Sequence, residues 1–177
     1  MPLKPSPSSP DKPYKLETAQ FKDEDFNERV HNLDPTAVRK TVNLGDICGL
    51  TKLGVHLVRI PPHSRSSTLH WHSSDDEWIY VLESGEAGAT LVTLPKGEKD
   101  TREETIRKGD FVAWPAGSGH GHVISTGDEE VTFLCSGTRE AMDVCTYPLA
   151  GKKLLIDRKG GPRWYADEAN VTYATRV

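Results

Sequence analysis

Short runs of apolar and β-branched residues recur along most of the chain after residue 36, partly alternating with polar residues. Each run is bounded by Gly, Pro, Asp or Ser, which favour turns between strands. These runs predict strands at Ala37–Leu44, Gly54–Ile60, Trp78–Leu82, Ala89–Leu94, Glu103–Arg107, Phe111–Ala113, Gly121–Ser125 and Val131–Cys135. Short strands at this spacing are typical of an all-β sandwich or barrel.

The two ends of the chain do not follow this pattern. The first thirteen residues hold five of the twelve prolines and bury too little apolar surface to offset ordering, so segment 1–13 is predicted to be a disordered, Pro/Ser-rich tail. An N-terminal extension over 14–36 is expected to carry a short helix at Glu24–Val30. The barrel is assigned to 37–150 and a C-terminal extension to 151–177. The run that begins at Leu149 fits either another strand or a short helix.

Composition narrows the class of protein. A chain of 177 residues fits one compact domain, and a net charge of -4 gives no reason to expect binding to nucleic acid or to a membrane. Cys48, Cys135 and Cys145 are widely spaced and form no C-x-x-C pair, which favours buried thiols in a reducing compartment. The sequence shows neither a secretory signal nor a long apolar stretch, so we expect a cytoplasmic protein.

One stretch carries candidate chemistry. His70-Trp71-His72, followed by Glu77 and then His120, supplies three imidazoles and one carboxylate, a donor set that suits a first-row divalent metal. Residues i and i+2 share one face of a strand, whereas on a helix they diverge by about 200°. The spacing therefore indicates a strand as well as a metal. Asp75 and Asp76 compete with Glu77 for the carboxylate position.

The same residues resemble the two sequence motifs of the cupins. The chain is similar to the small single-domain cupins of the conserved-barrel type. The first motif, G-x5-H-x-H-x3–4-E-x6-G, is matched by His70, His72 and Glu77, with Ser64 in place of its opening glycine and Gly85 one residue late. The second, G-x5-P-x-G-x2-H-x3-N, is matched by Gly109, Pro115, Gly117 and His120, with Ile124 at its last position. The resemblance implies a jelly-roll β-barrel whose metal ligands are His70, His72, Glu77 and His120.

The resemblance also implies a class of function. It favours a metal-dependent enzyme that acts on a small organic molecule, foremost a dioxygenase-type oxidoreductase, because three-His-one-Glu cupins are often dioxygenases. The alternatives are a metal-assisted isomerase, cyclase, lyase or decarboxylase, and a non-catalytic small-molecule binding cupin. One divalent ion is expected, and Fe, Mn, Ni, Co, Cu and Zn all suit the ligand set. Cupins commonly form homodimers, so a homodimer is expected here.

The remaining histidines are less clear. His122 lies two residues after His120, so on a continuing strand it faces the same interior. We interpret His122 as the candidate catalytic acid or base. The alternatives are that it is an additional metal ligand, or a histidine at the rim of the barrel that hydrogen-bonds to a loop. His31, His56 and His63 are interpreted as surface or hydrogen-bonded histidines.

Overall fold

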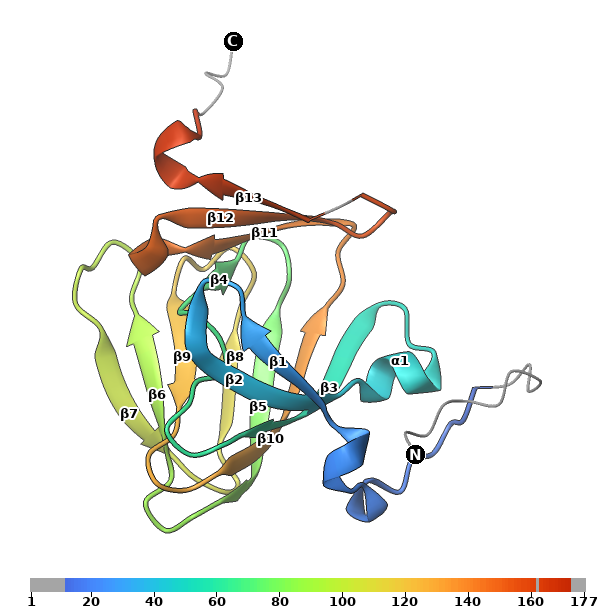
Figure 1. Ribbon diagram of the computed structural model, residues 1–177. Coiled ribbons are helices and arrows are strands. Elements are labelled where there is room, and N and C mark those ends of the chain that lie inside the picture. The colour runs from blue at the N-terminus through green and yellow to red at the C-terminus, as the bar shows by residue number, and fades with distance from the viewer. Residues whose placement is uncertain (1–11, 162, 173–177) are drawn as a thin grey trace.

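The strands of the protein form three antiparallel sheets that close into a barrel (Figure 1). The structure, a computed structural model, describes residues 12–161 and 163–172. The sheets have the orders β1-β2-β3-β10-β5-β8, β13-β12-β11-β4 and β7-β6-β9. The strands are Asn27–His31 (β1), Asp34–Val42 (β2), Leu53–Ile60 (β3), Trp71–His72 (β4), Glu77–Ser84 (β5), Ala89–Leu94 (β6), Arg102–Ile106 (β7), Phe111–Trp114 (β8), Gly121–Ser125 (β9), Val131–Thr138 (β10), Met142–Tyr147 (β11), Lys152–Asp157 (β12) and Arg163–Asp167 (β13).

Among the described residues, helical structure is confined to short pieces. The α-helix Leu44–Cys48 (α1) lies beside β3, and 3-10 turns span Thr18–Gln20, Asp23–Asp25, Pro148–Ala150 and Glu168–Asn170. Within the described segments no helix has the length and apolar content needed to cross a membrane. The all-β jelly-roll barrel predicted from the sequence is therefore confirmed.

Each of the predicted strands is present, as β2, β3 and β5 to β10. The helix expected at Glu24–Val30 is wrong: only a 3-10 turn forms at Asp23–Asp25, and β1 begins at Asn27. Pairing with β2 explains the difference, since the open edge of β2 satisfies the backbone groups of this segment. The run after Leu149 becomes a 3-10 turn followed by β12. Most of the predicted tail at 1–13 lies outside the described residues.

The inner face of the six-stranded sheet is apolar at one end of its strands and polar at the other. This change occurs along β3, β5 and β10. The apolar ends pack into the main core, formed by Val58, Ile60, Ile79, Val81, Ala89, Leu91, Ile106, Trp114, Ile124, Val131 and Phe133. The polar ends carry His56, Glu77 and Cys135, which line a cavity. A close-packed core thus supports one side of the polar end and limits its movement.

The turn after β3 shows how the barrel accommodates a departure from the cupin motif. Ser64 takes the place of the motif glycine and is buried. Its hydroxyl donates to the Val38 carbonyl and accepts from the Val38 N–H, both at 2.8 Å. His63, one position before Ser64, is the residue with a left-handed backbone conformation, with a φ of +55°. The side chain at Ser64 therefore ties the loop that leads to His70 onto β2.

Candidate metal centre

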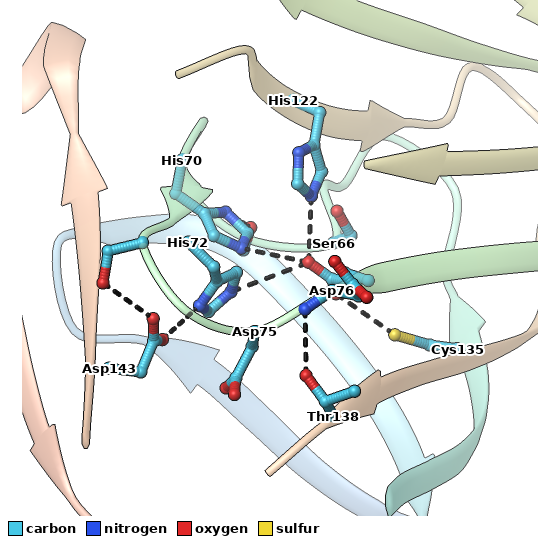
Figure 2. A network of polar contacts seen from close by, with 12 residues as sticks. Ser66, His70, His72, Asp75, Asp76, His122, Cys135, Thr138 and Asp143 are labelled. Atoms are coloured by element: carbon cyan, nitrogen blue, oxygen red, sulfur yellow. Dashed lines mark hydrogen bonds and ion pairs between the residues drawn. The ribbon is translucent and has the colours of Figure 1, made fainter. Parts of the chain in front are cut away.

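Three imidazoles converge on one carboxylate at the polar end of the barrel (Figure 2). Glu77 Oε2 lies 3.0 Å from His122 Nε2, 3.6 Å from His72 Nε2 and 3.8 Å from His70 Nε2. His72 lies on β4, Glu77 opens β5 and His122 lies on β9. His70 and His122 pair through reciprocal backbone hydrogen bonds of 2.9 and 3.2 Å. Strands from all three sheets therefore position the four side chains.

The structure differs from the sequence-based prediction at His120. His120 is exposed and precedes β9, whereas His122 is buried and joins His70 and Glu77 in a group of possible metal ligands. Gly117 and Gly119 both adopt positive φ, so the turn continues through His120 and the strand starts only at Gly121. The structure therefore does not bring His120 to the other three predicted ligands and places His122 beside them instead. His122, the expected catalytic residue, becomes the fourth candidate ligand.

Hydrogen bonds at Nδ1 determine how the His70 and His72 rings are oriented. His72 Nδ1 lies 2.6 Å from Oδ2 of Asp143, whose side chain is fully buried. His70 Nδ1 lies 2.8 Å from the carbonyl oxygen of Thr68, which can only accept. In both rings the proton therefore belongs on Nδ1, and the Nε2 lone pair points toward Glu77. Carboxylates and carbonyls that hold a histidine in this way are typical of metal sites.

The ionisation of the buried histidines agrees with this assignment. Burial, reinforced by the charge of His122, lowers the pKa of His70 to about 3, so this ring is neutral. Burial disfavours the charged form of His72, but the hydrogen bond to Asp143 and the charge of Glu77 outweigh it and raise its pKa. When the pH is above the pKa of His72, the unprotonated Nε2 atoms of His70 and His72 both face Glu77 Oε2, and no proton lies between them. A divalent cation would bond to all of these atoms, so the residues fit a metal.

Among the three acidic residues in this loop, Glu77 is the one with an oxygen within 3.8 Å of all three histidines. Burial disfavours its charged form, but the hydrogen bond from His122 and the nearby histidines hold its pKa well below the usual value. The Cys135 thiol donates to its second oxygen, Oε1, at 3.3 Å. Asp75 instead pairs with Arg158 at 2.6 Å, and Asp76 is exposed and accepts from the Ala116 N–H. Among these three carboxylates, Glu77 is therefore the candidate ligand for the centre formed with His70 and His122.

An aromatic ring covers the fourth candidate ligand. Trp114 stacks on His122 with ring centroids 3.7 Å apart and an interplanar angle of 11°. His122 Nδ1 is buried, and no described residue hydrogen-bonds to it. Stacking therefore orients this imidazole, in place of the Nδ1 hydrogen bonds that orient the other two.

A cavity of about 860 Å3 opens beside His70, His72 and Glu77, within the range of small-molecule sites. It is lined by His70, His72 and Glu77 and, toward β1 and β3, by His31 and His56. The sequence interpretation had assigned both of these histidines to surface or hydrogen-bonded roles. For His56, strand alternation could have indicated this position, because His56 precedes inward-facing Val58 by two residues and so shares its face.

Comparisons with known proteins agree with this geometry. Residues 56–137 match the family model of the cupin domain, Cupin_2. A provisionally assigned sugar phosphate isomerase from Acidithiobacillus ferrooxidans has 34% identity over 90% of this chain and 94% of its own, with a TM-score of 0.75. The chain belongs to the cupin superfamily. This cupin also resembles a sugar phosphate isomerase from Silicibacter pomeroyi, with 28% identity, coverage of 88% and 96%, and a TM-score of 0.69. No curated protein matches it.

Proposed function

We propose that this cupin is a metal-dependent sugar phosphate isomerase, with one divalent ion held by His70, His72, Glu77 and His122. The observation that carries the proposal is the convergence of three Nε2 atoms on Glu77 Oε2 beside a cavity of about 860 Å3. Two solved structures named as sugar phosphate isomerases align with nearly the whole chain and support the choice of reaction.

Isomerisation of a sugar moves a proton between neighbouring carbons, so the site needs an electrophile and a proton carrier. A divalent ion bound here would polarise a carbonyl or hydroxyl oxygen of the substrate. His56 is suited to carry the proton, since its Nδ1 donates to Asn43 Oδ1 at 2.9 Å and leaves the Nε2 lone pair free to accept. Burial, with the charges of Arg139 and Arg39, lowers the pKa of His56, so the ring is neutral near pH 7.

A dioxygenase was the leading expectation from the sequence. The same ligand set serves that chemistry, and the comparisons support only the cupin fold and a small-molecule enzyme, with isomerases as the full-length relatives. Oxygen consumption separates the two. Turnover of a sugar phosphate under anaerobic conditions supports the isomerase, and substrate-dependent oxygen uptake by the Fe(II) form supports the dioxygenase.

The direct test incubates metal-loaded protein with five- and six-carbon aldose and ketose phosphates in deuterated water. We expect interconversion with deuterium incorporation at the carbon that gains the proton, followed by NMR, and its loss in His72→Ala. A fully metal-loaded protein that exchanges no carbon-bound proton in any of these sugars would contradict the proposal.

His56 provides a sharper test of the proton transfer. His56→Gln should lower kcat by about 10²–10⁴ while metal content is retained, since general acid–base catalysis contributes that much. The matched control is His63→Gln, a surface histidine that pairs with Asp128 at 3.2 Å and is remote from the cavity lining. Equal kcat in the two variants would exclude His56 as the proton carrier.

A further inference from the structure

The cavity carries a charge opposite to that of the protein. The chain as a whole has a net charge of -4, yet seven basic and four acidic side chains line the cavity. Two of the basic residues are neutralised by close carboxylates, Arg139 by Asp46 and Arg158 by Asp75, both at 2.6 Å. A divalent ion would add further positive charge. The cavity is therefore suited to an anionic ligand.

Two arginines on β1 and β2 have no such partner among the residues that the structure describes. Arg29 and Arg39 lie directly opposite one another in the antiparallel pair, and both line the cavity. Like charges in this position repel and destabilise a sheet. Arg39 donates to the Ser66 carbonyl at 3.1 Å, and within the described ranges no carboxylate pairs with either guanidinium. An anion between them would relieve the repulsion and accept their remaining N–H groups.

A buried hydroxyl on the same wall also lacks a partner. Thr41 is two residues after Arg39 on β2, so it shares the inward face and lines the cavity. Its exposed fraction is 6%, and its Oγ1 has no hydrogen-bond partner in the described part of the chain. Buried hydroxyl groups are normally hydrogen-bonded, so an unpaired one indicates a ligand or water that completes it.

We propose that Arg29, Arg39 and Thr41 form a subsite for the phosphate group of the substrate. This inference rests on the proposed function, because it supplies the second anchor that a sugar phosphate needs. In the strand order, β2 with Arg39 and Thr41 is three strands from β5, which carries Glu77, and β1 with Arg29 is four strands from it. His56 lies on β3 between the two, where the carbon chain of a substrate anchored at both ends would pass.

The test measures the binding of inorganic phosphate to the metal-loaded full chain by calorimetry. Arg39→Gln should weaken binding roughly tenfold or more, as expected for lost hydrogen bonds to a charged group. Lys40→Gln is the matched control, because it makes the same charge change on the adjacent outward-facing residue, which pairs with Asp23. It should bind phosphate within about twofold of wild type, since it lies on the opposite face.

Thr41→Val provides a variant that folds with little perturbation, because the hydroxyl it removes is unpaired. It should weaken phosphate binding several-fold and raise KM for a sugar phosphate more than it lowers kcat. If Arg39→Gln and Thr41→Val bind phosphate as wild type does, the subsite is wrong even where metal-dependent isomerisation is found. If they lose phosphate while no isomerisation occurs, the subsite stands and the proposed reaction fails.

Discussion

Asp143 is expected to control metal affinity through His72. It accepts from His72 Nδ1 at 2.6 Å and from the Ser74 N–H at 2.9 Å, with no exposed side-chain surface. In Asp143→Asn, the amide can donate to Nδ1 and so move the imidazole proton to Nε2, where a metal would bind. Loss of such a partner typically weakens metal binding 10–100-fold.

The ionisation of Asp143 also contributes to folding stability. Burial disfavours its charge, but the hydrogen bonds from His72, Ser74 and Ser73 outweigh this and lower its pKa from 3.8 to about 2. At roughly 1.4 kcal/mol per pKa unit, this shift corresponds to about 2 kcal/mol of folding stability. Because the folded-state pKa is depressed, this stability is present above pH 3.8 and is lost as the pH falls toward 2.

The assay is a competition between the protein and a chelator of known affinity, with circular dichroism to show that each variant is folded. Asp46→Asn is the matched control, since Asp46 pairs with an arginine, Arg139 at 2.6 Å, and belongs to no group of possible metal ligands in the described chain. We expect it to leave both the fold and, within a few-fold, the metal affinity unchanged. A folded Asp143→Asn protein with wild-type metal affinity would refute the reasoning.

Three further outcomes are expected. His122→Ala should lose bound metal and His120→Ala should keep one ion per chain by elemental analysis; the reverse would restore His120 as the ligand. Metal affinity should fall as the pH drops through the raised pKa of His72, above 6.5, because a proton then occupies Nε2, and constant affinity from pH 8 to 6 would contradict this. Gly137→Ala should cost about 1–3 kcal/mol in chemical denaturation, since its Cβ would lie 2.7 Å from the Asp76 carbonyl oxygen; unchanged stability would contradict the packing.

The strands and the first half of the site could be predicted because they depend on local pattern. Apolar alternation fixes which face of a strand is buried, and the shared face of His70 and His72 follows from that parity, whereas Glu77 was indicated by the spacing of the cupin motif. The position of His120 outside this cluster could not be predicted, because the two positive-φ glycines before it extend the turn and delay the strand. Spacing along the sequence does not report such backbone conformations.

The cavity wall depends on contacts that are distant in sequence. Arg29 and Arg39 become neighbours only when β1 pairs with β2, and the polar segment that holds Arg29 gave no strand signal. His56 gains its significance from Cys135, its partner on β10, which reaches Glu77. Such long-range pairings are not contained in local periodicity. The homodimer and the cytoplasmic location stay predictions.

The stack of Trp114 on His122 also makes the site observable. Indole emission is quenched by a contacting imidazolium and by transition-metal ions with partly filled d shells, and this indole lies 3.7 Å from a candidate ligand. Loading and removal of the ion should therefore change the intrinsic fluorescence of the protein without any added label. A Trp114→Phe protein would keep a stacked ring and lose that optical signal, which would assign the signal to this tryptophan among the four in the chain.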